Sequence, residues 1–343
     1  MSQVQFDIDG ETLITREQIA GATSATLPSD MLAQAEAQLA LLLGITQGRL
    51  ASGTQAGAAV GYLFAELHKL RAAVAPENWQ ALVPQAQRHP VAELLHQDPF
   101  TAWSFDKPRG YSGDARLLDF IYRHPSVETL VADATPLGRA IYDYTSSAPA
   151  AAAVRERREI LAQTVDRTAE RAPGAEILTI AGGHLREAGL TAALEAGRIG
   201  RWIVLDQDPM SVGSMVRDFS GSVVEARDGS VKGLLGKTYS LGTFDCVYAA
   251  GLYDYLPENA AIRLTRVCLD LLKPGGEFLF ANFNREIDDD GYMETFMNWP
   301  LLLRSEAEMR EIADASMQGV EGTSEIFYGA NRNIIYGICR KAN

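Results

Sequence analysis

Residues 176–190 read EILTIAGGHLREAGL, and this stretch decides the fold. An apolar, β-branched run ends at Ile180, three small residues follow at 181–183, and a helix-forming segment opens near Arg186-Glu187. Open α/β folds place an adenosine-bearing ligand at such a strand, turn and helix start. The small turn leaves room for the ligand, and a helix N-terminus offers free N–H groups. The stretch therefore predicts a nucleotide-type site.

The surrounding chain changes texture at Ala172-Pro173-Gly174. Beyond this point apolar strand-like runs alternate with helical stretches, which indicates a parallel sheet with crossover helices. The expected strands are 177–181, 202–205, 222–225, 244–249 and 277–283. Two further strand-like segments, 325–328 and 333–339, are joined by a short Gly- and Asn-containing turn and predict a terminal antiparallel hairpin.

The first half of the chain is helical in pattern and shows no convincing strand. Helices are expected over 30–43, over 57–75 with a stop at Pro76, over 114–123, and after Pro149. The last of these carries the charged stretch Arg155–Glu159, which we interpret as a solvated face. The sequence predicts a helical N-terminal domain over residues 1–150 and an α/β domain over residues 151–343.

Composition narrows the class of function. The formal net charge of −13 gives no electrostatic basis for binding nucleic acid. The three scattered cysteines and the histidines outside the turn show no metal-ligand spacing, so reduced, mostly buried thiols and no metal are expected. No secretion signal or membrane-length apolar run is evident, which favours a cytoplasmic protein without a membrane partner.

Acidic residues follow the second and third expected strands. Asp206 ends the second strand, where a carboxylate can accept hydrogen bonds from both hydroxyls of a ribose. Asp208 is better placed to cap the next helix. Asp228, with Gly229 beside it, ends the third strand and could accept from an adenine amino group, or it is an ordinary turn residue.

Two later motifs complete the pattern. FDCVYAAGLYDYL begins at Phe244, and LKPGGEFLFANF begins at Leu272. With the glycine turn and the strand-tip acid, these motifs resemble the class I S-adenosylmethionine-dependent methyltransferases over residues 173–341. The resemblance implies a Rossmann-like seven-stranded sheet with an antiparallel last strand, and S-adenosylmethionine as cofactor.

A narrower resemblance extends upstream. KPRGYSGD at 107–114, the run 117–122 and GGHLREA resemble a branch with a helical N-terminal domain. That branch includes 3-hydroxypalmitate methyl ester synthases and cyclases that convert S-adenosylmethionine to azetidine-2-carboxylate. The chain departs from the superfamily where Thr179 replaces the usual acid of the first strand. Ala181, Gly183 and Leu185 stand where three spaced glycines are usual. The sequence therefore does not identify the residue that holds the ammonium group of the cofactor.

The resemblance and the residues together nominate a site. The cofactor-binding candidates are Gly182, Gly183, Asp206, Gln207, Asp228, Gly229 and Ala250; the catalytic candidates are Tyr253, Asp254 and Tyr111. Tyr253 could instead be core packing. Tyr111 belongs to a Gly-rich loop that either forms a lid or simply turns into a helix capped by Asp114. His184 is a candidate base, but a turn-shaping or solvent-facing role is favoured.

The sequence supports two reactions of one cofactor. The first is methyl transfer to an O- or N-acceptor on a small molecule of secondary metabolism, with the helical half as lid. The second is intramolecular cyclisation to azetidine-2-carboxylate, with methylthioadenosine as the other product. A dinucleotide-dependent oxidoreductase is disfavoured because G-x-G-x-x-G is absent after the first strand. Whether the chain forms a homodimer stays open.

Overall fold

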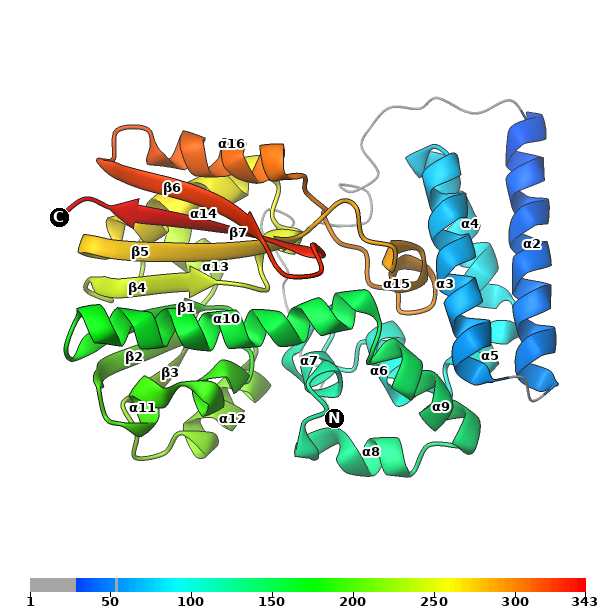
Figure 1. The fold of residues 1–343 in the computed structure, drawn as a ribbon, viewed down its shortest axis with the longest axis horizontal. Helices are drawn as coiled ribbons and strands as arrows, with labels where there is room; N and C mark the ends of the chain where they lie inside the picture. The colour runs from blue at the N-terminus through cyan, green and yellow to red at the C-terminus, as the bar shows by residue number, and fades with distance from the viewer. Residues whose placement is uncertain (1–28, 53–54) are drawn as a thin grey trace. The chain divides into compact units, whose positions relative to one another are not determined.

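The computed structural model describes residues 29–52 and 55–343, and these residues form two compact units. We call residues 153–286 and 301–343 the sheet unit. The helical unit consists of residues 29–52, 55–152 and 287–300. Figure 1 shows the elements of both units, coloured along the chain.

The sheet unit is built on seven strands in the order β3-β2-β1-β4-β5-β7-β6. Strands β1 to β5 run parallel, whereas β7 pairs antiparallel with both β5 and β6. This is the class I methyltransferase sheet that the sequence predicted, and the terminal hairpin is confirmed. The strands are β1 (Ala175–Ile180), β2 (Ile199–Asp206), β3 (Val224–Asp228), β4 (Phe244–Ala249), β5 (Leu272–Phe283), β6 (Gly322–Tyr328) and β7 (Ile334–Lys341).

Helices cover both faces of this sheet (Figure 1). Alternate strand residues such as Leu178, Val247 and Phe278 enter one apolar core with α13, α14 and α16. Burial on both faces is why the central parallel strands read as continuous apolar runs. The remaining helices of this unit are α10 (Pro149–Arg171), η2 (Arg186–Leu190), α11 (Ala192–Glu195), α12 (Pro209–Asp218), α13 (Val231–Leu235), η3 (Tyr253–Tyr255), α14 (Glu258–Asp270) and α16 (Glu306–Met317).

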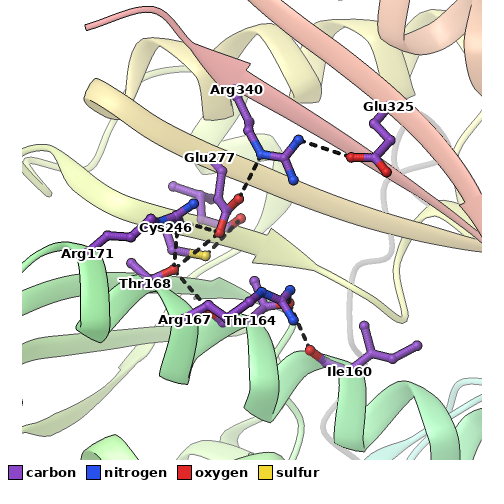
Figure 2. A network of polar contacts seen from close by, with 10 residues as sticks. Ile160, Thr164, Arg167, Thr168, Arg171, Cys246, Glu277, Glu325 and Arg340 are labelled. Carbon is purple, nitrogen blue, oxygen red and sulfur yellow. Dashed lines mark hydrogen bonds and ion pairs between the residues drawn. The ribbon is translucent and has the colours of Figure 1, made fainter.

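Helix α10 is fixed to the other face of the sheet by a buried charge. Glu277 of β5 is only 2% exposed; its Oε1 accepts from Arg171 Nη2 at 2.7 Å, and its Oε2 accepts from Arg340 Nε at 3.2 Å (Figure 2). Thr168 Oγ1 also donates to Glu277 at 3.3 Å. Two guanidinium groups and a hydroxyl compensate the desolvation of the carboxylate. The network therefore ties the second half of α10 to β5 and β7.

The KPGG motif forms a bulge within β5 rather than a turn before it. The pairing of β4 with β5 jumps from Phe244↔Leu272 to Cys246↔Glu277, so the four β5 residues 273–276 lie opposite the single β4 residue Asp245. Gly275 adopts a left-handed φ of +72°. Glycine adopts that conformation without strain, which explains why the motif contains it.

The helical unit has more helices than its apolar pattern predicted; the first covers Ser29–Ala51 rather than 30–43, whereas the helix expected over 114–123 covers only Ala115–Ile121. The expected stop at Pro76 is the start of the next helix, because proline fits the first helical turn. The helices are α2 (Ser29–Ala51), α3 (Ala56–Ala73), α4 (Pro76–Arg88), α5 (Val91–Leu95), α6 (Pro99–Asp106), α7 (Ala115–Ile121), η1 (Pro125–Val127), α8 (Glu128–Ala132), α9 (Pro136–Thr145) and α15 (Asp290–Thr295). In the described part of the chain, no helix combines the length and apolarity needed to span a membrane.

Helix α15 is separated in sequence from the other helices of the helical unit. Its segment, residues 287–300, lies after β5 in the chain but belongs to the helical unit. Arg71 of α3 donates to Asp290 at 2.8 Å and to Glu294 at 2.8 Å, and Trp79 Nε1 of α4 also donates to Glu294. A purely apolar reading of the sequence misses this assignment because charged and indole groups make these contacts.

Candidate functional site

The carboxyl ends of β1 to β4 define the candidate site. From β1 the chain first adds β2 and β3 on one side and then crosses to add β4 and β5 on the other, so a topological switch point lies between β1 and β4. Open α/β sheets bind ligands outside the carboxyl ends of the strands at such a point. Gly182 and Gly183 follow β1, Asp206 ends β2, Asp228 ends β3 and Ala250 follows β4. The topology therefore brings the predicted cofactor residues of the sheet unit to one edge.

The turn after β1 has an alternating left-handed backbone. Ala181, Gly183 and Leu185 have φ values of +54°, +59° and +51°. In the sequence these three residues stand where three spaced glycines are usual, and all three adopt a φ that glycine adopts without strain. Left-handed conformations at non-glycine residues cost energy, and they concentrate at functional sites.

The segment after this turn differs from expectation. The helix expected to open near Arg186-Glu187 is a 3₁₀ helix of five residues, η2, followed by the four-residue α11. A long helix dipole therefore does not contribute at this turn. Packing also requires glycine at position 182, because a Cβ there would lie 2.3 Å from Val204 Cγ1.

Asp206 is anchored by the backbone on both sides. Gly183 N donates to its Oδ2 at 2.7 Å, and Asp208 N donates to its Oδ1 at 2.8 Å. Burial raises the pKa of Asp206 to about 6, and the side chain is 7% exposed. Each carboxylate oxygen keeps a further lone pair after these bonds. A vicinal diol has two donors that match them, so the residue fits a ribose.

Some neighbours of Asp206 have structural roles, and others are exposed and free to contact a ligand. Asp208 caps α12, since its Oδ1 accepts from Met210 N at 2.9 Å, and this confirms the capping prediction. Asp228 pairs in register with Asp206 across β2 and β3, and it is exposed, as is Gln207. Gly229 lies close to Leu205 Cδ2, 3.1 Å from the position of its missing Cβ. Asp228 and Gln207 are thus open to a ligand, whereas Gly229 also serves packing.

An arginine of α10 contacts the backbone just after β4, at residues 250–251, although the sequence predicted that this arginine faces solvent. Arg157 of α10 is only 5% exposed, and its Nη1 donates to the carbonyl of Ala250 at 2.7 Å. The interpretation of the charged stretch as a solvated face is therefore wrong for Arg157. Glu156 beside it accepts from Ala330 N in the β6–β7 turn, at 2.8 Å from Oε1.

Tyr253 and Asp254 occupy different surroundings. The Tyr253 side chain is fully buried in the apolar core, and its hydroxyl lies 2.7 Å from Thr265 Oγ1. This position fits packing rather than contact with a substrate. Asp254 is 3% exposed, and its Oδ1 accepts from Phe283 N at 2.7 Å. Burial raises the pKa of Asp254 to about 6.

Glu187 and Tyr248 lie near the turn and were not predicted as site residues from sequence. Glu187 is 7% exposed, and Tyr248 Oη donates to its Oε1 at 2.7 Å. Burial raises the pKa of Glu187. Thr179, in the position of the usual strand-one acid, accepts from Trp202 Nε1 at 2.9 Å. The spacing of Glu187 from the glycine turn was the only available signal for it.

His184 is buried in the same turn. Its exposure is 6%, and its Nδ1 lies 3.2 Å from Arg186 Nη2. A solvent-facing position is excluded, whereas a turn-shaping role agrees with these contacts.

The candidates of the helical unit are described within that unit. Asp114 caps α7 by accepting from Arg116 N and Leu117 N, and Gly110 and Gly113 have φ values of +87° and +75°. The turn-and-cap interpretation of this loop is thus confirmed. Tyr111 is half-buried in the loop, and its lid function stays a prediction. Among the described residues, no group of three or more His, Cys, Asp or Glu side chains could hold a metal ion.

Comparisons with known proteins bear on the fold. No family model matches the chain, and a search of curated proteins finds no match. A solved structure of a "possible exported protein" from Bordetella parapertussis covers 93% of this chain and all of its own, with 18% identity and a TM-score of 0.55. At that identity the likeness shows the fold alone.

Other solved structures carry methyltransferase names. N-methyltransferase NodS from Bradyrhizobium japonicum, in complex with S-adenosyl-L-homocysteine, has 16% identity and a TM-score of 0.41 over 66% of this chain and 100% of its own. Magnesium protoporphyrin IX methyltransferase from Synechocystis, with bound S-adenosylmethionine, has 11% identity and a TM-score of 0.40 over 57% and 84% of the two chains. With TM-scores below 0.5, neither resemblance carries an argument about this chain.

Proposed function

We propose that the protein consumes S-adenosylmethionine and transfers its methyl group to an O- or N-acceptor on a small molecule of secondary metabolism. The observation that carries this proposal is the arrangement of Asp206. A buried, doubly anchored carboxylate ends β2 beside a left-handed small-residue turn, on a class I methyltransferase sheet.

Each end of the cofactor would have partners in the sheet unit. Asp206 would accept from the ribose hydroxyls, and the exposed Asp228 and Gln207 would face the adenine side. Gly182, Gly183 and Ala250 flank the switch point, where the aminoacyl end would lie. The sulfonium of the cofactor supplies an already activated methyl group, so the chain mainly has to align the acceptor.

The proposed roles at the acceptor side differ among the catalytic candidates. Asp254 would hold the loop after β4 against β5 by accepting from Phe283 N through Oδ1, and Oδ2 would be the oxygen that takes a proton. Tyr253 would support the same loop from the core. Tyr111 remains proposed as a lid residue that contacts substrate.

A second candidate function is favoured by Glu187. Cyclisation forms a bond between the amino nitrogen and the γ-carbon of S-adenosylmethionine and breaks the bond from that carbon to sulfur. The electron pair leaves with sulfur as methylthioadenosine, and the nitrogen must lose a proton. A buried carboxylate with a raised pKa, held by Tyr248, is a suitable proton acceptor.

One incubation separates the two functions. The purified protein is mixed with S-adenosylmethionine alone and the products are analysed by mass spectrometry. Methyl transfer predicts S-adenosylhomocysteine only when an acceptor is added. Methylthioadenosine together with azetidine-2-carboxylate, formed without an acceptor and lost in Glu187→Gln, would establish the cyclase instead. Absence of any cofactor binding by calorimetry would overturn both.

A further inference from the structure

The guanidinium of Arg157 is buried with a single hydrogen bond. The side chain is 5% exposed and donates one hydrogen bond, from Nη1 to Ala250 O. A guanidinium has five N–H donors. Among the residues that the structure describes, no carboxylate lies within ion-pair distance of Arg157; Glu187 and Asp254 feel its charge only at longer range. Buried charges in proteins are normally paired, so this arginine lacks an expected anionic partner.

The position of this arginine is specific. Ala250 follows β4 directly, at the switch point between β1 and β4. Gly251, the next residue, has no side chain, and a Cβ there would lie 3.8 Å from Arg157 Nη2. Gly251 is itself exposed, so Arg157 Nη2 lies beside exposed backbone at the carboxyl edge of the sheet.

A ligand group that fits must be anionic and small. With the ribose assigned to Asp206 on β2 and the adenine to Asp228 on β3, the opposite end of S-adenosylmethionine extends toward β1 and β4. That end carries an α-carboxylate, which matches the planar fork of a guanidinium. We propose that Arg157 binds the α-carboxylate of the cofactor, an inference that rests on the proposed function.

Glu187 and Asp254 complete the charge pattern. Both carboxylates lie close enough to Arg157 for its charge to act on them. The aminoacyl end of the cofactor is a zwitterion, so a cationic arginine with two acids nearby matches both of its charges. The loss of an acid at Thr179 is then offset by groups from α10, η2 and the loop after β4.

The test compares two ligands on one protein by calorimetry. S-adenosylhomocysteine carries the aminoacyl end, and methylthioadenosine lacks it while keeping the adenosine and the thioether. We expect Arg157→Gln to weaken S-adenosylhomocysteine roughly 10- to 100-fold and to change methylthioadenosine less than about twofold. Arg167→Gln is the matched control, since it removes one positive charge from α10 about 15 Å further along the helix.

A second comparison needs no variant. Decarboxylated S-adenosylmethionine should bind the unaltered protein about 10-fold or more weaker than S-adenosylmethionine, and Arg157→Gln should add little to that loss. Equal losses for S-adenosylhomocysteine and methylthioadenosine in Arg157→Gln, or equal affinity of the unaltered protein for the carboxylated and decarboxylated ligands, would overturn the assignment. Failure of the unaltered protein to bind even methylthioadenosine would instead reject the proposed function, and the assignment with it.

Discussion

A single carboxylate, Asp206, links the backbone turn to the proposed ribose site. Its oxygens hold the amides of Gly183 and Asp208 and still have lone pairs for a diol. We predict that Asp206→Ala abolishes cofactor binding, because two hydrogen bonds to a charged acceptor contribute about 3–6 kcal/mol. Isothermal calorimetry with S-adenosylhomocysteine measures the loss.

The matched control for this prediction is Asp208→Ala. It removes the α12 cap, at a cost of about 1 kcal/mol in the free energy of unfolding, but it keeps the backbone amide that Asp206 accepts from. Cofactor affinity should survive in this control. Unchanged affinity in Asp206→Ala would remove the ribose assignment.

Titration of the same carboxylate gives a second readout. Burial raises the pKa of Asp206 to about 6, so the ionised form dominates at pH 7.5 and the protonated form dominates at pH 5. Hydroxyl donors of a ribose favour the ionised form. Affinity should therefore be level above pH 7 and fall by up to about tenfold per pH unit below 6. Asp206→Asn cannot titrate and should lose this dependence.

At the scale of elements, the turn after β1 holds a strained backbone. Ala181 has a φ of +54°, where an L-residue pays about 1–2 kcal/mol that glycine does not. Ala181→Gly should raise the free energy of unfolding by up to about 1 kcal/mol after the greater chain entropy of glycine is subtracted. Denaturant unfolding followed by circular dichroism measures this change.

The same substitution elsewhere serves as its control. Ala192 is exposed at the first position of α11, directly after the extended N-cap Thr191, so Ala192→Gly should lower stability by up to about 1 kcal/mol. A destabilised Ala181→Gly would show that the methyl group of Ala181 contributes more than the strain costs.

Elements were predictable from sequence where local pattern decides them. The expected strands overlap all seven observed strands, and the run at 244–249 matches β4 to the residue, because a strand buried on both faces is apolar almost throughout. The half-exposed β3 overlaps its expected range by only two residues. The bulge at 273–276 was missed because its register depends on β4. Arg157 was missed because its burial depends on a carbonyl 93 residues away, which no helical periodicity reveals.

Some residues of the candidate site could likewise be predicted from local position, whereas others needed the structure. Asp206 and Asp208 were distinguished by position alone, since one ends a strand and the other precedes a helix. The sequence could not distinguish the roles of Tyr253 and Asp254, because both belong to one 3₁₀ turn. In the structure Tyr253 packs in the apolar core, whereas Asp254 binds the backbone of Phe283. Glu187 belongs to no motif; its spacing from the glycine turn is the only sequence signal, and its contact with Tyr248 appears only in the structure.

At the scale of the whole molecule, the helical unit is discontinuous in sequence. Residues 287–300 complete it, and Gly291 of α15 packs on α3 so closely that a Cβ would lie 2.7 Å from the carbonyl carbon of Leu67. Gly291→Ala should therefore lower the free energy of unfolding by about 1–3 kcal/mol, because backbone must shift to accept it. Thermal unfolding measures the change.

A glycine in open space gives the control. Gly44 of α2 has no heavy atom within 4 Å of its missing Cβ, so Gly44→Ala should raise stability by about 0.5–1 kcal/mol. If Gly291→Ala behaved like Gly44→Ala, the close packing of α15 on α3 would be refuted.

The position of α15 in the chain also sets an order of events during synthesis. Arg71 and Trp79 are made early, yet their carboxylate partner Glu294 leaves the ribosome more than 200 residues later. By then β1 to β5 have all been synthesised. During synthesis, Arg71 and the indole of Trp79, in the helices at 56–88, therefore lack this carboxylate until residues 287–300 have been made, after the strands of the sheet unit that precede them. The time needed to translate residues 88–294 thus sets how long these two side chains lack their carboxylate partner.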